Sequence, residues 1–166
     1  GATPEMVSQL DAALSVFAQV VEEELGLKVA DLPGSGAAGG LGAGLVTFLQ
    51  AQLQPGVKII SEAVGLKEKI FGADLVITGE GRIDGQTIKG KTPIGVAAVA
   101  KELGVPVLGV AGSLGYQAEL VYEHGIDGMI AIVDRPMTLQ EAIASASELV
   151  SLATERIFRT FMAGRG

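Results

Sequence analysis

The chain has 166 residues, 48% of them apolar, with no cysteine and a formal net charge of −7. This length suits one domain or a domain and a half, and the apolar content is sufficient for one sizeable core. The acidic balance argues against nucleic acid or an anionic membrane as the main partner, because both attract clustered Lys and Arg. The absence of cysteine excludes a disulfide scaffold, a thiolate metal site and a cysteine nucleophile, and it is compatible with a cytoplasmic location.

The first part of the chain predicts helices around a glycine-rich segment. Residues 3–25 carry apolar side chains at helical spacing, with Thr3 placed to cap the helix and Gly26 placed to end it. A glycine-rich run at 33–44 follows. The remaining elements expected in this part are a helix at 45–53, a strand at 57–60 and a short helix at 61–71. The chain starts at Gly1 without an initiator Met and has no signal peptide, so we expect it to be cut from a longer polypeptide.

From residue 73 onward, strands and helices alternate regularly. The expected elements are strands at 75–78, 105–111 and 128–133 and helices at 93–103, 116–123 and 139–162. Thr138 and Glu141 have the spacing of a capping box at the start of the last helix. Such alternation predicts an α/β fold in which right-handed βαβ units build a parallel sheet with flanking helices, as in one half of a Rossmann or flavodoxin-like domain. We therefore expect residues 1–72 to be part of a second, helix- and glycine-rich α/β domain, and residues 73–166 to be a βαβαβα part of the parallel-sheet domain. No apolar run approaches the roughly 18–20 residues that cross a bilayer.

Three loops are expected at the carboxyl ends of these strands, where open parallel sheets bind ligands. They span residues 78–91, 112–115 and 134–136. The first loop has the parts for phosphoryl transfer, because Glu80 and Asp84 could hold Mg²⁺ or accept a hydroxyl proton, while Arg82 and Lys91 could neutralise phosphate oxygens. In an extended loop, residues 80, 82 and 84 would point to one side. The alternative is a surface loop with an internal pair between Arg82 and a carboxylate.

The other candidate positions are open to two interpretations each. Thr92 and Lys91 at a helix start could bind an anion, or Thr92 could simply cap the helix. Gly112 and Ser113 could bind phosphate through backbone N–H groups, or they could form a tight turn. His124 is expected at a helix C-terminus rather than as a catalytic base. The pair at 134–135 could contact a ligand or form a turn.

The glycine-rich segment resembles a phosphate-cradling loop that enters a helix. Ser35, Gly36 and Gly39 would then offer hydroxyl and backbone donors to an anion. The segment is not a P-loop, since no Gly-Lys-Ser/Thr follows, and it lacks the preceding strand and later acidic residue of the Rossmann fingerprint. The alternative is that these glycines allow two backbones to pack closely.

The sequence from Asp74 to Thr87, followed by Gly90-Lys91-Thr92-Pro93-Ile94-Gly95-Val96-Ala97, closely resembles the type I glycerate kinase family. The resemblance continues at Ala111-Gly112-Ser113 and extends back through residues 33–44 to the opening residues. It implies ATP- and Mg²⁺-dependent phosphorylation of D-glycerate, usually to 2-phosphoglycerate, in a cleft between two α/β domains. Family members are about twice this length, and their N-terminal strand and Asp-Ser-Phe-Lys-Gly-Ser type loop have no counterpart here. The resemblance therefore implies the C-terminal portion of such an enzyme, inactive without the missing part.

The resemblance also implies roles for the candidate residues. Arg82 would clamp the glycerate carboxylate or the transferring phosphoryl group, Asp84 would orient or deprotonate the hydroxyl, Glu80 would act through Mg²⁺, and Lys91 would balance phosphate charge. Glu80 and Asp84 are the expected metal ligands. The residues expected to bind the cofactor are Ser35, Gly36, Gly39, Gly79, Gly81, Thr92, Gly112 and Ser113.

Two other functions remain compatible with the sequence. A non-catalytic module that binds a small anion would show no turnover, and bare surface left by the missing half could make it a homodimer. A nicotinamide-dependent oxidoreductase fits the βαβ pattern but lacks a proper dinucleotide fingerprint.

Overall fold

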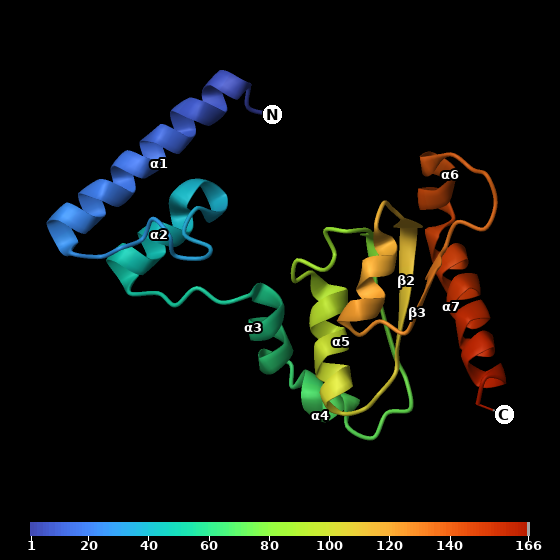
Figure 1. The fold of residues 1–166 in the computed structure, drawn as a ribbon. Helices are drawn as coiled ribbons and strands as arrows, with labels where there is room; N and C mark the ends of the chain where they lie inside the picture. Colours follow the sequence, from blue (N-terminus) through green and yellow to red (C-terminus); the bar gives the residue numbers. More distant parts are fainter. Residues whose placement is uncertain (166) are drawn as a thin grey trace. The chain divides into compact units, whose positions relative to one another are not determined.

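The structure is a computed structural model that describes residues 1–165. Contacts divide the chain into two compact units, Gly1–Gln54 and Pro55–Gly166 (Figure 1). The division falls before the boundary expected near residue 72, because helices α3 (Gly56–Ala63) and α4 (Leu66–Ile70) pack against α5 (Thr92–Glu102) of the second unit. The assignment of these units to the domains of a full-length protein stays a prediction.

The first unit consists of α1 (Pro4–Leu25) packed on α2 (Ala37–Leu49). The expected start and end of α1 are confirmed: the Thr3 hydroxyl accepts a hydrogen bond from the Met6 N–H at 3.3 Å, and Gly26 adopts a left-handed φ of 68°. The first turn of α2 is irregular, with three successive residues at positive φ from 38 to 40. The small core of this unit consists of the buried side chains of Val21, Val29 and Ala43.

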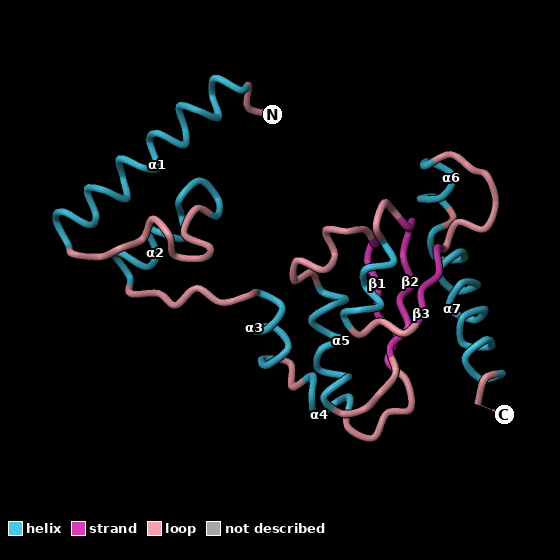
Figure 2. The backbone as a smooth tube through the Cα atoms, viewed as in Figure 1, coloured by secondary structure: helices cyan, strands magenta, loops and turns pink. Residues whose placement is uncertain are grey.

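The second unit contains a three-stranded parallel sheet within the described residues. Its strands are β1 (Val76–Ile83), β2 (Val107–Leu114) and β3 (Gly128–Ala131), side by side in that order (Figure 2). This arrangement confirms the predicted α/β class with a parallel sheet and flanking helices.

Helices cover both faces of this sheet (Figure 1). The buried Val107 and Ala111 of β2 belong to a core shared with α5 and with the 3₁₀ helix η1 (Ala118–His124). Val110, on the opposite face, belongs to a second core with Leu149 of α7 (Ala146–Ala163). The alternation along β2 therefore decides which helix each side chain packs against.

The long helix expected at 139–162 is two helices, α6 (Leu139–Ala144) and α7, which meet at Ser145. The predicted capping box is confirmed, because the Thr138 hydroxyl accepts from the Glu141 N–H and the Glu141 carboxylate accepts from the Thr138 N–H. Ser145, with φ −101° and ψ 12°, lies outside regular helical geometry and separates the two segments. A serine favours such a boundary because its side chain competes for backbone hydrogen bonds.

The strand expected at 57–60 is wrong, because these residues belong to α3. Three β-branched residues, Val57, Ile59 and Ile60, suggested a strand. Among the described residues, however, this segment pairs with none of the three strands. Val57 instead packs against α5 at Gly95, where an added Cβ would lie 2.1 Å from Val57 Cγ2. Tertiary packing of a helix against a helix thus outweighs the local β propensity.

Candidate active site at the carboxyl end of the sheet

The first strand of the sheet runs further than the sequence suggested. β1 continues to Ile83, so Glu80 and Arg82 lie in the strand rather than in a loop, and Asp84 directly follows it. β2 likewise continues to Leu114, and Arg82 is paired in register with Ser113. The predicted loops at 78–91 and 112–115 therefore begin too early. Residues 78–83 and 112–114 belong to β1 and β2, which remain paired there. The pairing places Glu80 and Arg82 of β1 and Ser113 of β2 close to the carboxyl ends of two neighbouring strands.

At this end of the sheet, two cationic side chains, Arg82 and Lys91, both pair with the carboxylate of Asp84. Asp84 Oδ2 lies 3.3 Å from Arg82 Nε, and Asp84 Oδ1 lies 3.8 Å from Lys91 Nζ. The Asp84 side chain is only 20% exposed, whereas that of Arg82 is 62% exposed and that of Lys91 is 43% exposed. The two cations therefore remain accessible with one net positive charge, a combination suited to a carboxylate or phosphate ligand. We call Arg82, Asp84 and Lys91 the Asp84 cluster.

Thr87 connects Glu80 to the Asp84 cluster. Its side chain is fully buried, and its hydroxyl donates to Glu80 Oε1 at 2.5 Å and accepts from the Asp84 N–H at 3.1 Å. Asp84 Oδ1 in turn accepts from the Gln86 N–H at 2.9 Å. Thr87 was not among the residues predicted from the sequence, although the hydroxyl of a threonine three residues after an aspartate in a turn often bonds to the backbone.

The glycines of β1 and β2 differ in what they do. A Cβ on Gly79 would lie 2.1 Å from the Val110 carbonyl oxygen, and one on Gly112 would lie 2.4 Å from the Gly81 carbonyl oxygen. These two glycines are therefore required by the close approach of the strands. A Cβ on Gly81 would meet no atom within 4 Å. Of the three, only Gly81 leaves open space beside the backbone, and the cofactor-binding role of all three stays a prediction.

Gly115, just after β2, makes room for the arginine of the cluster. A Cβ at this position would lie 2.6 Å from Arg82 Nε and 2.9 Å from Asp84 Cβ. The Gly115 N–H also donates to the Ile83 carbonyl at 2.7 Å, which fixes the end of β2 against β1. The guanidinium of Arg82 thus lies directly over a backbone that carries no side chain.

The start of α5 lies beside the same cluster. Lys91 is the residue that precedes the helix, and it makes no side-chain capping bond. Thr92 is already the first helical residue, so the alternative interpretation that Thr92 caps the helix is wrong. The anion-binding role of Lys91 and Thr92 stays a prediction, and it now rests on the position of Lys91 in the cluster.

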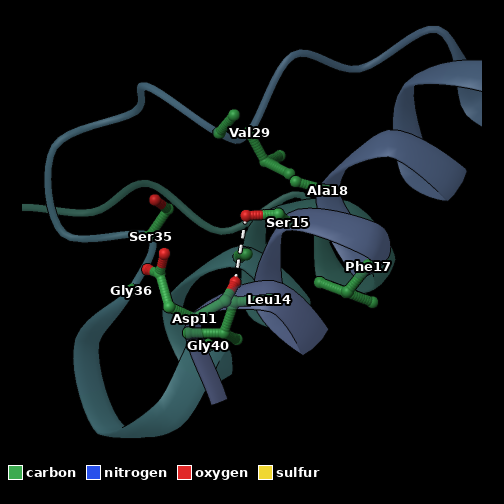
Figure 3. A pocket seen from close by; sticks show the side chains of 11 residues that line it. Asp11, Leu14, Ser15, Phe17, Ala18, Val29, Ser35, Gly36 and Gly40 are labelled. Atoms are coloured by element: carbon green, nitrogen blue, oxygen red, sulfur yellow. Dashed lines mark hydrogen bonds between the residues drawn. The ribbon is translucent and has the colours of Figure 1, made fainter. Parts of the chain in front are cut away.

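The glycine-rich candidates lie in the other compact unit. Ser35 and Gly36 line a pocket of about 220 Å³ between α1 and the turn before α2, whereas Gly39 is not part of its lining (Figure 3). The segment follows α1 and a turn, not a strand. The strand–loop–helix arrangement that binds dinucleotides is therefore not formed there.

The remaining candidates have ordinary structural partners. Asp134 pairs with Arg156 of α7 at 3.1 Å and with Arg135 at 3.0 Å, and the hydrogen bond from Arg156 is the main cause that lowers the pKa of the Asp134 carboxyl. This pairing attaches the segment after β3 to α7. His124 is the last residue of η1, as expected for a helix end. None of the helices in residues 1–165 combines the length and apolarity needed to cross a membrane.

Comparisons with known proteins agree with one another. The model of the Glycerate kinase family matches residues 1–162. A glycerate kinase of Halalkalibacterium halodurans is 54% identical over 95% of this chain and 41% of its own length. The glycerate 2-kinase of Escherichia coli K12 is 46% identical over 99% of this chain and 43% of its own length.

The same likeness is found among solved structures. The crystal structure of a protein described as glycerate kinase 2 from Salmonella typhimurium LT2 has a TM-score of 0.73 and 45% identity, over 99% of this chain and 42% of that one. The chain thus spans about two fifths of the length of the relatives that it matches. From the matching model, the identities and the shared fold, we conclude that the chain belongs to the glycerate kinase family.

Proposed function

We propose that the chain is part of an ATP-dependent kinase that phosphorylates D-glycerate to 2-phosphoglycerate. The observation that carries this proposal is the Asp84 cluster, in which two accessible cations and a carboxylate meet at the carboxyl end of a parallel sheet. Family membership and the glycerate 2-kinase relative in Escherichia coli support the substrate and the product.

The geometry supports distinct roles for the members of the cluster. Arg82 and Lys91 supply the positive charge that a glycerate carboxylate or a transferring phosphoryl group requires. Asp84 holds both cations and would orient or deprotonate the glycerate hydroxyl. Thr87 is a positioning residue, because it binds Glu80 through its side chain and the Asp84 backbone at the same time.

A magnesium ion is compatible with the oxygen ligands at this site. Mg²⁺ is usually held by one or two carboxylates together with substrate phosphates and water, and not by a dedicated protein cage. Residues 1–165 contain no group of three or more metal-ligating side chains. Glu80 binds Thr87 through its carboxylate and Asp84 binds Thr87 through its backbone N–H, and the side chains of these two residues could supply the two carboxylates. The ion would neutralise phosphate charge when bound. We therefore propose that it arrives with ATP and is held by Glu80 and Asp84.

Substitutions in a full-length protein that carries this sequence test the proposal. Arg82→Ala and Asp84→Asn should each lower kcat by at least about a hundredfold if these side chains contact the transition state. Arg159→Ala serves as the matched control, since Arg159 is 76% exposed on α7 and pairs only with Glu155 among the described residues. A loss of less than about threefold for Arg82→Ala or Asp84→Asn would remove that residue from the mechanism.

The 166-residue chain alone should show negligible turnover in a coupled assay of ADP release. The relatives are more than twice as long, and the family site is expected to include loops from the remainder. Turnover of the isolated chain close to that of a full-length relative would contradict this proposal. A homodimer and a cytoplasmic location also stay predictions, and light scattering on the same sample tests the first.

A further inference from the structure

The first unit contains a pocket, and of its lining residues only Ser35 and Gly36 were predicted from the sequence to bind a ligand. It lies within residues 11–43 and has a volume of about 220 Å³. Leu14, Phe17 and Val29 form an apolar side, whereas Asp11 and Ser35 form a polar one (Figure 3). We call it the Asp11 pocket. A small apolar wall with a few convergent polar groups is typical of a site for a small molecule.

Close backbone packing determines the shape of this pocket. A Cβ on Gly40, which has a φ of 89°, would lie 2.6 Å from Leu14 Cδ2 on α1. A Cβ on Gly42 would lie 2.2 Å from the Gly34 carbonyl oxygen. The Ser35 carbonyl accepts from the Ala43 N–H at 2.9 Å, which holds the turn against α2. The glycines therefore bring α2 close to both α1 and the turn at residues 34–35, and the pocket is a consequence of this packing.

Ser35 brings a hydroxyl into the pocket without a partner. The residue is only 8% exposed, and its backbone N–H donates to the Leu32 carbonyl at 3.0 Å. Its hydroxyl makes no hydrogen bond with any other group in residues 1–165. This hydroxyl can therefore donate to or accept from a ligand group in the pocket, and such a bond would add to the affinity.

The negative charge of Asp11 determines which ligand groups can bind in the pocket. Its carboxylate points toward Ser35 and Gly36 in Figure 3, and it forms no ion pair with any cation in residues 1–165. The Asp11 backbone is held by the Ser15 hydroxyl, which donates to the Asp11 carbonyl at 2.9 Å. An ionised carboxylate only accepts hydrogen bonds, so it attracts ligand O–H groups and repels a phosphate placed at the same point.

We propose that the Asp11 pocket binds the adjacent hydroxyl groups of a small polyhydroxylated ligand. The carboxylate of Asp11 accepts from one or both ligand hydroxyls, the Ser35 hydroxyl bonds to the same group, and the apolar side holds the carbon skeleton. Neighbouring hydroxyls of this kind occur on the ribose of a nucleotide and on glycerate. The proposal rests on the proposed function only for the choice of these two probes.

Titration of the ¹⁵N-labelled 166-residue chain by NMR tests the pocket without any turnover. One arm compares ADP with its 2′,3′-dideoxy analogue, and the other compares D-glycerate with lactate, which lacks one hydroxyl. We expect one of the hydroxyl-bearing probes to shift amide signals between Asp11 and Ala43 in a saturable manner, and its deoxy partner to bind at least about tenfold more weakly. The arm that responds identifies the source of the hydroxyls.

Substitutions in the same chain separate this binding from unspecific effects. Asp11→Asn should weaken binding at least about tenfold, because it removes the charge that accepts the hydroxyls, and Ser35→Ala should weaken it measurably. Glu24→Gln makes the same change of charge at an exposed position of α1 outside the pocket and should leave the affinity within about twofold.

Three results would overturn the proposal: no saturable shifts within Asp11–Ala43 from either probe, unchanged affinity in Asp11→Asn, or inorganic phosphate bound at these amides more tightly than both probes. None of them would affect the kinase proposal, because that proposal is tested by the turnover of Arg82→Ala and Asp84→Asn.

Discussion

A single buried hydroxyl joins the two acidic residues of the candidate site. Thr87 donates to the Glu80 carboxylate and accepts from the Asp84 backbone, and its side chain is shielded from solvent. A buried polar group with two partners is costly to remove, because both partners then lose a hydrogen bond that water replaces poorly. The position of Glu80 relative to the Asp84 cluster therefore depends on one residue that carries no charge.

Thr87→Val tests this dependence, since it replaces the hydroxyl by a methyl group of similar size. We expect the free energy of unfolding of the chain, measured with urea, to fall by about 1–3 kcal/mol. In the full-length protein, kcat should fall and the apparent affinity for Mg²⁺ should weaken, because Glu80 loses its anchor.

Thr87→Ser is the matched variant, because it keeps the hydroxyl and loses one methyl group. It should restore most of the Mg²⁺ affinity even if some stability is lost. Equal Mg²⁺ affinity in Thr87→Val and the parent protein would show that Thr87 has a structural role only.

At the scale of elements, β1 and β2 pack so closely that some positions between them have room only for glycine. The substitutions Gly79→Ala and Gly81→Ala add the same methyl group to the same strand, two residues apart. The first places a Cβ 2.1 Å from the Val110 carbonyl oxygen, and the second meets nothing within 4 Å. Gly79→Ala should therefore lower the free energy of unfolding by about 1–3 kcal/mol or more, and Gly81→Ala should change it by less than about 1 kcal/mol.

Urea unfolding of both variants measures this difference, and similar losses would contradict the proposed role of Gly79. Gly81→Ala carries a second outcome in the full-length protein. If a ligand approaches the Gly81 backbone, the added methyl group should raise the KM for ATP or glycerate while the stability stays unchanged.

One aspartate joins the start of β2, the start of β3 and α5. Asp127 accepts from Lys101 Nζ at 2.7 Å and from the Val107 N–H at 2.7 Å. Burial alone would raise the pKa of the Asp127 carboxyl, but the hydrogen bonds from Lys101 and Val107 and the charge of Lys101 hold the pKa below its ordinary value of 3.8. A lowered pKa in the folded state means that the ionised group stabilises the fold above pH 3.8, and that this contribution is lost as the pH falls through the folded pKa.

Asp127→Asn should consequently reduce the free energy of unfolding at neutral pH, and the difference from the parent chain should narrow as the pH falls below 3.8. Urea titrations of both proteins at several pH values measure this difference in the free energy of unfolding. Glu123→Gln, an exposed change of the same kind on η1, should show no such convergence. A difference that is constant with pH would indicate that the Asp127 charge does not contribute.

At the scale of the whole molecule, the two compact units differ in the size of their cores. The first unit has a core of three buried residues, whereas ten buried residues form the larger core of the second. A segment without helix or strand, residues 50–55, joins them. Fewer buried apolar contacts mean a lower local stability, so the first unit should open more readily.

Limited digestion with a protease of broad specificity should therefore cut the chain first within or before residues 50–55 and leave a resistant fragment that starts near Pro55. Mass spectrometry of the fragments checks this result. A first cut within α5 or β2 would contradict the assignment of the larger core to the second unit.

The sequence by itself determined the α/β class, the helical start at Thr3, the capping box at Thr138 and the family. These features depend on local patterns or on a long, varied motif, which need no distant contact to be recognised. It also identified Arg82, Asp84 and Lys91 as candidates, because charged residues after a buried strand are typical of sheet edges that bind ligands.

Only the tertiary structure decided how these residues are arranged. Pairing with β2 extends β1 through Glu80 and Arg82, and packing on α5 makes a helix of the strand expected at Val57, because both outcomes depend on distant partners. The polar side of the Asp11 pocket likewise brings together Asp11 and Ser35, which are far apart along the chain. Residue types establish what chemistry the chain carries, and folding establishes which groups meet.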